Sequence, residues 1–295
     1  MIKVAILGST GMLGSTLTRY LENEPVDICE FNRSGTSITK NNEAKKFDIT
    51  IDANLFHDLK KIKFDYIINC IGFIKHLISE DSEHSVKSAY EINANFPSRL
   101  NEYASEFKTP IIQIGTDCVY SGQKGDYSES DPHDPNDIYG VTKSKGEIAS
   151  TASMILRCSI IGKEVASAHS LLSWVLSHPK NSKIKGFTNH YWNGLTTLHF
   201  SQIVFGIIKS NSFRQGVFHL IPSEVVNKHE LITLITQAFD RTDLKIEEFA
   251  TDIAVNRSLT TNNAQQNLTL WNNAGYNQIP TIEEMVFSYA KWLKR

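Results

Sequence analysis

The segment KVAILGSTGMLG, close to the start of the chain, constrains the fold more than any other feature of the sequence. An apolar run over residues 3–8 predicts a buried strand, and Gly8, Gly11 and Gly14 follow in a GxxGxxG spacing where a helix is expected to begin. Such glycines permit a tight turn, let the backbone approach a pyrophosphate and let the helix pack closely on the strand. Because the helix N-terminus also supplies N–H donors, the segment predicts a dinucleotide-binding strand, loop and helix.

The first half of the chain alternates short apolar runs with longer helical patterns. Strands are expected at 3–8, 26–31, 66–72, 110–116 and 153–162, and helices at 12–22, 52–61, 81–107 and 138–150. Near-continuous apolar runs of this length suit strands that are buried on both faces of a parallel sheet. The alternation therefore predicts an α/β fold with a Rossmann-type, doubly wound parallel sheet.

Beyond residue 162 the pattern is looser, and the loops are rich in Asn and Thr. Helices are expected at 168–178, 199–210, 227–240 and 281–293, and a further strand at 216–221. We expect residues 1–162, joined by about 198–221, to form the dinucleotide-binding domain, and residues 163–197 with 222–295 to form a smaller, mostly C-terminal α/β substrate lobe.

Charge and cysteine content argue against several classes of function. A formal net charge of −2 and a pI near 6.6 give no electrostatic reason to expect nucleic acid or an anionic membrane as partner. Cys29, Cys70, Cys118 and Cys158 form no CxxC or Cys/His cluster, which disfavours zinc and an Fe–S cluster. The first apolar run is too short for a signal peptide or a membrane span. We expect a cytoplasmic protein with reduced thiols, and a homodimer is an open alternative.

The second predicted strand ends in FNRSG, where a dinucleotide site reads the adenosine ribose. An acid at this place would accept a hydrogen bond from the 2′-hydroxyl of NAD. Here Asn32 is neutral, and Arg33 with Ser34 offers groups that suit a 2′-phosphate. These residues predict NADP(H) in preference to NAD(H), with the alternative that Arg33 is only a solvated loop charge.

The stretch DIYGVTKSKGE, residues 137–147, places Tyr139 and Lys143 one turn apart on one face of a predicted helix. A free tyrosine titrates at about pH 10, and a neighbouring ammonium favours phenolate. Lys143 is therefore expected to lower the pKa of Tyr139 toward a range useful for proton transfer. Gly140 and Gly146 each cost about 1 kcal/mol in a helix relative to Ala, so we expect them to permit close packing against the cofactor or a neighbouring helix. The alternative is an exposed helix on which Tyr and Lys co-occur by chance.

GTDCVYSG, residues 115–122, follows the strand expected at 110–116. It should lie at the carboxyl edge of the sheet, where open α/β folds bind ligands. Thr116 is then placed to donate a hydrogen bond to a substrate oxygen beside Tyr139. The alternative is that Thr116 and Asp117 only cap a turn.

Together, the glycine loop, the strand-end threonine and the YxxxK pair resemble the extended short-chain dehydrogenase/reductase family. The resemblance covers about the first 160 residues. Within that family, TDCVYSGQKGDYSESDPHDPNDIYGVTKSKGE is similar, in order, to the pattern of the dTDP-4-dehydrorhamnose reductases. LGSTGMLGSTL is typical of the same group.

The resemblance implies that Thr116, Tyr139 and Lys143 are the catalytic set. Tyr139 would be the general acid toward a ketone oxygen, Thr116 a polarising donor, and Lys143 a modulator of the tyrosine pKa that also binds the nicotinamide ribose. Asp48 and Ile49 would flank the adenine. The full set expected at the cofactor is Gly8, Thr10, Gly11, Met12, Leu13, Asn32, Arg33, Ser34, Asp48, Ile49, Cys70, Ile71, Gly72, Tyr139 and Lys143.

The residues expected to bind substrate are Thr116, Asp117, Arg157, Trp192, Gly194 and Thr196. NHYWNGLTT, residues 189–197, aligns only loosely with a loop of these reductases that touches nucleotide and sugar, because a proline is missing and the tryptophan is unexpected. That tryptophan suits stacking on a base or sugar, and equally suits the core. Arg157 suits a bidentate contact with a diphosphate, and a structural ion pair is the alternative.

Asp117 is followed by Cys118, whereas the related nucleotide-sugar 4,6-dehydratases carry an Asp–Glu pair after the catalytic threonine. The missing carboxylate favours ketone reduction over elimination. The resemblance therefore implies NADPH-dependent reduction of the 4-keto group of a nucleotide-diphospho-4-keto-6-deoxysugar. Two alternatives stay open: a non-catalytic NADP-binding protein similar to the regulatory subunit of methionine adenosyltransferase, and a nucleotide-sugar epimerase.

Overall fold

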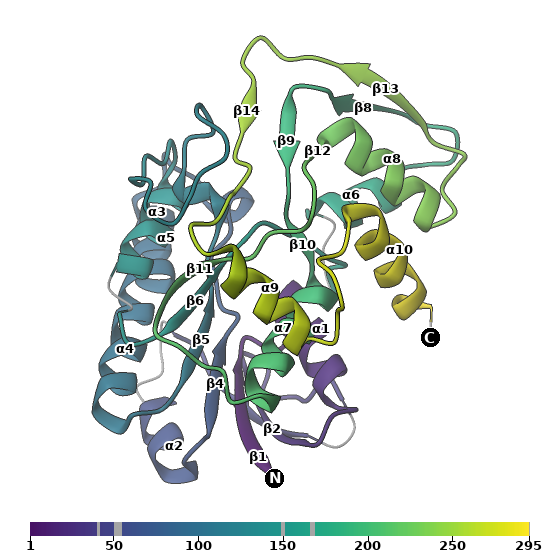
Figure 1. The fold of residues 1–295 in the computed structure, drawn as a ribbon. Coiled ribbons are helices and arrows are strands. Elements are labelled where there is room, and N and C mark those ends of the chain that lie inside the picture. The colour runs from purple at the N-terminus through teal and green to yellow at the C-terminus, as the bar shows by residue number, and fades with distance from the viewer. Residues whose placement is uncertain (40–41, 50–54, 149–150, 166–168, 295) are drawn as a thin grey trace.

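The computed structural model describes residues 1–39, 42–49, 55–148, 151–165 and 169–294. Its central sheet has the strand order β11-β6-β5-β4-β1-β2-β3 (Figure 1). The strands are β1 Ile2–Leu7, β2 Val26–Asn32, β3 Glu43–Lys46, β4 Tyr66–Asn69, β5 Ile111–Ile114, β6 Met154–Arg157 and β11 Gly216–His219. Every neighbouring pair is parallel, which confirms the predicted Rossmann-type sheet.

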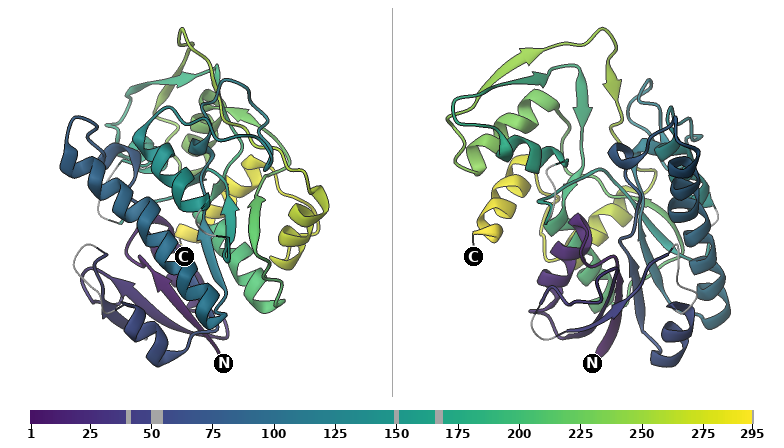
Figure 2. Two further views of the ribbon diagram at one scale, coloured as in Figure 1. Left: turned by 90° about the vertical axis from the view of Figure 1, so that its left-hand side faces the viewer. Right: turned by 180° about the vertical axis from the view of Figure 1, so that it is seen from behind.

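Helices cover both faces of this sheet (Figures 1 and 2). One face carries α1 (Met12–Leu21), α7 (Thr197–Lys209) and α9 (Ala264–Asn273), and the other carries α2 (Leu55–Ile62), α3 (Glu83–Tyr90), α4 (Phe96–Phe107) and α5 (Ile138–Ile148). Along β1, Val4 and Ile6 enter the core on the α1 side, while Ala5 and Leu7 enter the core on the α2 side. Because both faces are buried, the strand reads as one continuous apolar run.

A smaller lobe lies beyond the carboxyl ends of the strands (Figure 1). It contains α6 (Leu171–Ser177), α8 (Lys228–Ala238), α10 (Ile282–Leu293), the pair β8 (Lys183–Phe187) with β13 (Lys245–Phe249), and the sheet β12-β9-β14 (Val226–Asn227, His190–Trp192, Val255–Asn256). The exact domain boundaries stay a prediction. Among the helices that the structure describes, none has the length and apolar character needed to cross a membrane.

Two predicted elements are divided in the structure. The helix expected at 81–107 is α3, a π-helical turn Glu91–Asn95, and α4. Pro97 at the start of α4 lacks the N–H that a continuous helix would need. In the wide turn, Asn93 accepts a hydrogen bond from Phe73 N (2.8 Å) and donates to Phe73 O (2.9 Å), which fixes the loop after β4.

The strand expected at 153–162 also divides. β6 ends at Arg157, and β7 (Ile160–Ile161) pairs instead with β10 (Leu195–Thr196), where the chain enters the smaller lobe. The sequence reading missed β3 and α9, because both are mostly polar; Trp271 is the main buried anchor of α9. Residues 52–54, 149–150 and 168, at the ends of predicted helices, lie outside the described residues.

A segment near the C-terminus returns to the large lobe and pairs with the loop that follows β5. Tyr127 N donates to Ser258 O (2.9 Å), and Thr260 N donates to Tyr127 O (2.8 Å). The Glu129 carboxylate accepts from Thr261 Oγ1 (2.7 Å) and from the backbone of the next residue. This return segment, residues 255–262, holds side chains of the smaller lobe against the carboxyl edge of the sheet.

Candidate active site

The glycine loop joins β1 to α1 as predicted. Gly8 has a φ of +84°, and a Cβ on Gly14 would collide with the Gly8 carbonyl oxygen, so both positions require glycine. Gly11 is the N-cap of α1, and no side chain caps that helix. The predicted cofactor residues Thr10, Gly11, Met12 and Leu13 all lie at this end. The first-turn N–H groups therefore lack intrahelical acceptors, which suits a diphosphate.

The chain that leaves β4 passes beside this loop. Cys70 N donates to Leu7 O (3.0 Å), and Ile71 N donates to Asn69 Oδ1 (3.1 Å). A Cβ on Gly8 would lie 2.8 Å from the Ile71 side chain. The structure thus brings the predicted residues Cys70, Ile71 and the exposed Gly72 next to the glycine loop.

The end of β2 holds a correction. Asn32 is buried, and its amide already bonds Ser9 Oγ (2.9 Å), Ser34 N (3.1 Å) and Gly35 N (2.8 Å). Asn32 therefore shapes this loop and has no free group with which to read a ribose, contrary to the expectation. Arg33 and Ser34 are exposed at the loop's surface.

Two acids, Asp48 and Glu30, lie near this edge of the sheet. Asp48 and its neighbour Ile49, which were predicted to flank the adenine, are half-buried and follow β3, which pairs with β2. The sequence reading overlooked Glu30, which is fully buried inside β2. Its carboxylate accepts from Ser37 Oγ (2.6 Å) and Ile38 N (3.3 Å), so it holds the following loop.

The predicted catalytic residues meet at the carboxyl edge of the sheet. Thr116 lies two residues after the end of β5 and is 6% exposed. It accepts a hydrogen bond from Cys118 N at 3.2 Å and caps the 3₁₀ turn Asp117–Val119. The same hydroxyl is in hydrogen-bonding contact with the phenol of Tyr139, in the first turn of α5. Thr116 is therefore both the turn cap and the neighbour of Tyr139, the two roles that the sequence left open.

The expected effect of Lys143 on Tyr139 is wrong. The pKa of Tyr139 is raised, chiefly by burial of the phenol and further by the neighbouring acidic groups of Cys118 and Asp117, although the Thr116 hydrogen bond lowers it. The Lys143 ammonium donates instead to Ile114 O (3.1 Å). The phenol therefore stays protonated at neutral pH, as a proton donor must.

The two glycines of α5 do permit close packing. A Cβ on Gly140 would collide with the Cys118 carbonyl oxygen, and one on Gly146 with the Asn93 carbonyl oxygen of the π-helical turn. The predicted approach to a neighbouring helix is therefore confirmed. The contact at Gly140 brings α5 against the turn that follows Thr116, so it also sets the place of Tyr139.

Two cations from the smaller lobe face Asp117. Burial raises the pKa of Asp117, and the charges of Arg257 and Lys228 oppose that rise. Burial lowers the pKa of Lys228, at the start of α8, to about 8, while Asp117 acts in the opposite direction. Arg257 Nε donates to Tyr120 O (2.9 Å), and its terminal nitrogens have no acceptor among the residues that the structure describes. Two cations and one carboxylate thus meet next to the Thr116–Tyr139 pair.

Trp192 is 3% exposed, and its indole N–H has no acceptor in the described part of the chain. Lys228 Nζ lies 5.5 Å from the centre of its ring. Leaving a buried N–H without a partner costs about 1–3 kcal/mol. A ligand oxygen would satisfy this donor, so the structure keeps Trp192 among the candidates.

Gly194 and Thr196 have structural roles, and a contact of either residue with substrate stays a prediction. A Cβ on Gly194 would collide with the Ser159 carbonyl oxygen, so glycine is needed for packing. Thr196 is fully buried, and its Oγ1 lies 2.7 Å from His199 Nδ1 at the N-terminus of α7. Neither residue offers a free polar side-chain group to a substrate.

Arg157 does not reach the cleft either, so the alternative of a structural ion pair holds. It is 2% exposed, and Glu147 Oε2 accepts hydrogen bonds from Nε (3.1 Å) and Nη2 (2.6 Å). Its other donors bond Tyr120 (2.7 Å), His219 (2.7 Å) and His133 (2.9 Å). No guanidinium donor is left for a diphosphate.

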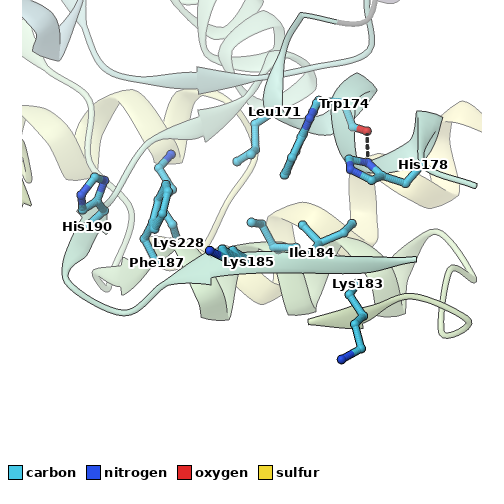
Figure 3. A pocket seen from close by; sticks show the side chains of 10 residues that line it. Leu171, Trp174, His178, Lys183, Ile184, Lys185, Phe187, His190 and Lys228 are labelled. Carbon is cyan, nitrogen blue, oxygen red and sulfur yellow. Dashed lines mark hydrogen bonds between the residues drawn. The ribbon is translucent and has the colours of Figure 1, made fainter. Parts of the chain in front are cut away.

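A cavity of about 400 Å³ lies in the smaller lobe between α6, β8 and α8 (Figure 3). Trp174 and Phe187 give it aromatic faces, and Lys228, one of the two cations beside Asp117, also lines it. Figure 3 shows Lys183 pointing away from the other side chains. The residues lining the cavity are Leu171, Trp174, His178, Lys183, Ile184, Lys185, Phe187, His190, Lys228 and Ile232.

Sequence reasoning missed Lys228, Arg257 and the aromatic cavity. One local signal was present: a lysine at the first position of a helix faces the positive end of the helix dipole, which is unfavourable unless an anion is near. Arg257 carried no such signal, because it reaches the cleft only through the pairing of the return segment with the loop after β5.

Comparison with known proteins places this geometry in a family. The family model described as the RmlD substrate binding domain matches residues 2–294. A dTDP-4-dehydrorhamnose reductase of Aggregatibacter actinomycetemcomitans is 26% identical over 246 residues, covering 80% of this chain and 78% of that protein. The methionine adenosyltransferase 2 subunit beta of Bos taurus is 22% identical over 254 residues, covering 81% of this chain and 72% of that protein.

The fold also matches solved structures. A dTDP-4-dehydrorhamnose reductase from Bacillus anthracis, solved in complex with NADP, superposes with a TM-score of 0.79 at 20% sequence identity, covering 100% of this chain and 99% of that one. At this identity the likeness shows a shared fold. It extends over both lobes and is not limited to the dinucleotide-binding half.

Proposed function

Because the chain belongs to the RmlD substrate-binding family, we propose that it is an NADPH-dependent reductase of the 4-keto group of a nucleotide-diphospho-4-keto-6-deoxysugar. One observation carries the proposal: the Thr116–Tyr139 hydroxyl pair lies at the sheet edge that also carries the glycine loop, and the adjacent Asp117 faces the cations Lys228 and Arg257. The hydroxyls supply a proton and a hydrogen bond to a reacting oxygen. The cations supply the charge that a nucleotide diphosphate needs.

The residues around the glycine loop fit a nicotinamide dinucleotide. The uncapped N-terminus of α1 and the absence of a side chain at Gly11 leave N–H donors for its diphosphate. Residues 70–72 would lie along it, and Asp48 and Ile49 would lie near its adenine. When bound, the reduced cofactor supplies a hydride equivalent to a ketone carbon.

Preference for NADP(H) rests on Arg33 and Ser34, which are exposed at the end of β2 where a 2′-phosphate would lie. The buried acid of this strand, Glu30, is already bonded to Ser37 and offers no carboxylate to a ribose. Replacing Arg33 with Ala should weaken NADPH binding much more than NADH binding. Equal losses for the two cofactors would overturn this preference.

Tyr139 serves as the proton donor toward the ketone oxygen. Its raised pKa keeps the phenol protonated in the free protein, and the Thr116 hydroxyl donates a hydrogen bond to the same ketone oxygen. Lys143 holds the strand end, and with it Thr116, through its hydrogen bond to Ile114 O. Cys118 follows Asp117 in place of a second carboxylate, so this site lacks the acid pair suited to elimination.

The diphosphate of the substrate is bound from the smaller lobe. Lys228 and Arg257 offer charge, and Trp192 offers a buried indole N–H with no acceptor in the described chain. Charge-assisted hydrogen bonds of this kind contribute about 1.5–3 kcal/mol each. Binding energy from the nucleotide would hold the sugar ketone in line with the Tyr139 phenol, where it can raise the rate.

The aromatic cavity accepts the nucleobase. Trp174 and Phe187 suit stacking on a flat ring, and the polar groups that line the cavity are lysines and histidines, without a carboxylate or an amide side chain among the described residues. Such a lining favours a base with carbonyl acceptors over one that must donate from an amino group. We expect a 2,4-dioxopyrimidine, that is, uracil or thymine.

The test is NADPH oxidation, followed by absorbance, with a panel of 4-keto-6-deoxy nucleotide sugars generated in place by dehydratases. Wild type should turn over a uracil- or thymine-linked member, and Tyr139→Phe should lose about 10²–10⁴-fold in kcat. The match to a methionine adenosyltransferase subunit supports a second candidate, an NADP-binding regulatory subunit. Tight NADP(H) binding without turnover of any sugar would overturn the reductase and favour that candidate.

A further inference from the structure

Helix α5 presents a third side chain to the end of β5. Tyr139, Lys143 and Glu147 recur at intervals of four residues, so they follow one another along one side of the helix. Glu147 is 4% exposed and lies two turns beyond Tyr139. Its carboxylate takes no part in the reaction proposed above.

Lys143 and Glu147 hold two peptide groups of the same strand end. Lys143 Nζ donates to Ile114 O (3.1 Å), and Glu147 Oε1 accepts from Thr116 N at the longer distance of 3.4 Å. Gly115 lies between them, and its N–H donates to Leu156 O (2.8 Å) of the neighbouring strand β6. The backbone around Thr116 is thus fixed on both sides by α5 and across the sheet by β6.

Gly115 makes this arrangement possible. A Cβ at that position would lie 2.8 Å from Glu147 Oε1 and 3.0 Å from Arg157 Cα. Any side chain would therefore separate the strand end from the carboxylate.

The Glu147 carboxylate is held in place, because its Oε2 accepts two hydrogen bonds from the buried Arg157 guanidinium (3.1 and 2.6 Å). Arg157 is in turn fixed by Tyr120, His133 and His219. Burial lowers the pKa of Lys143, and the Glu147 charge opposes that effect. Glu147 is therefore placed to act on both neighbours of Tyr139.

We propose that Glu147 is a positioning residue of the reductase: its carboxylate fixes the end of β5, and with it the Thr116 hydroxyl, beside Tyr139. The inference rests on the proposed function, since it assigns Glu147 a task in that reaction. Removing the charge should leave cofactor binding intact and reduce turnover through Thr116.

A double-mutant cycle on kcat tests this directly. Glu147→Gln should lower kcat on the order of 10- to 100-fold, the scale of a small displacement of a reacting group, with little change in the Kd for NADPH. In a Thr116→Val background the same substitution should have a much smaller effect. Equal fold losses in both backgrounds would overturn the proposal.

The pH profile of kcat gives a readout that a purely structural role would not move. Without the Glu147 charge, Lys143 loses its proton at lower pH, and with it the charge-assisted hydrogen bond to Ile114 O that holds the strand end. The alkaline limb of the profile should therefore shift toward neutral pH in Glu147→Gln. Glu129→Gln is the matched control, because that carboxylate also accepts from backbone amides, His219 N (2.9 Å) and Asn262 N (2.8 Å), outside the site. An alkaline limb that shifts equally in both variants would contradict a specific role.

Gly115→Ala serves if Glu147→Gln folds poorly, since it keeps both charges and separates the strand end from the carboxylate. It should show the same dependence on Thr116. Hydrogen–deuterium exchange of the peptide covering residues 114–120 needs no turnover, so it distinguishes failure of this inference from failure of the proposed function. Uptake there should rise in Glu147→Gln more than in Glu129→Gln, and equal uptake would overturn the proposal.

Discussion

The two sides of the cleft differ in how the chain assembles them. Thr116, Tyr139 and Lys143 come from one strand end and the next helix of the sheet, and their spacing along that helix brings them together. Lys228 and Arg257 come from α8 and the return segment, which meet only through tertiary pairing. The proposed catalytic residues are thus brought together by local spacing, whereas the cations proposed to bind substrate meet only through the packing of the smaller lobe.

The largest expected difference between the two sides lies in two arginines. Arg157 is 2% exposed and shares its donors among four side chains, whereas Arg257 keeps its terminal nitrogens without an acceptor in the described chain. Arg157→Met leaves Glu147 buried and unpaired, so it should lower the free energy of unfolding by about 3–5 kcal/mol. Arg257→Met should change that free energy by about 1 kcal/mol or less and raise KM for the nucleotide sugar about 10-fold or more.

Urea unfolding and steady-state kinetics on the two variants check this prediction. Matched losses of stability, with KM unchanged in Arg257→Met, would remove the distinction between a structural and a ligand-binding arginine.

The proposed binding of substrate by Lys228 predicts that kcat/KM depends on pH. The pKa of Lys228 is lowered to about 8 by burial, so its ammonium is present below that pH and is lost above it. In wild type, kcat/KM for the nucleotide sugar should therefore fall as pH rises through about 8. Lys228→Arg should remain flat there, because a guanidinium keeps its charge. Persistence of the same fall in Lys228→Arg would assign it to another group.

The smallest expected effect concerns the buried network under the catalytic side. Burial, and next the charge of Arg157, lower the pKa values of His133 and His219, although Glu147, Asp134 and Glu129 act in the opposite direction. The folded state then binds fewer protons than the unfolded chain, so stability should be lost as pH falls below the unfolded histidine value of about 6.5.

His133→Gln tests this, because glutamine can still accept from Arg157 and donate to Ser144. The difference in unfolding free energy between pH 7.5 and 5.5 should shrink on the order of 1 kcal/mol relative to wild type. If this difference in unfolding free energy were unchanged, groups other than His133 would cause the loss of stability at low pH.

Much of the fold, and the meeting of Thr116 with Tyr139, could be predicted from sequence, because both depend on local patterns. The apolar runs that become β1, β4 and β5 identify a sheet buried on both faces, and the spacing of Tyr139 and Lys143 survives in α5. Local patterns failed where burial determines a property. The helix spacing predicted a lowered pKa for Tyr139, but burial of the phenol raises that pKa.

The residues proposed to bind substrate were harder to predict from sequence, because burial and tertiary contacts decide which of them are free. Three residues have types that suit a ligand but make other contacts in the fold. Arg157 bonds Glu147, Gly194 packs against the Ser159 carbonyl, and Thr196 caps α7. Arg257 looks unremarkable in sequence and becomes a candidate ligand only when Tyr120 O anchors it over the cleft. Residue type alone cannot reveal which donors remain free after folding.

Single-turnover kinetics tests most directly whether Tyr139 acts in the chemical step and Lys228 in substrate binding. Enzyme with bound NADPH would be mixed with increasing nucleotide sugar, so that the limiting rate and the Kd are measured separately. Tyr139→Phe should lower the limiting rate with Kd nearly unchanged, whereas Lys228→Met should raise Kd with the limiting rate nearly unchanged. A Lys228→Met variant that lost limiting rate as strongly as Tyr139→Phe, at unchanged Kd, would contradict the account.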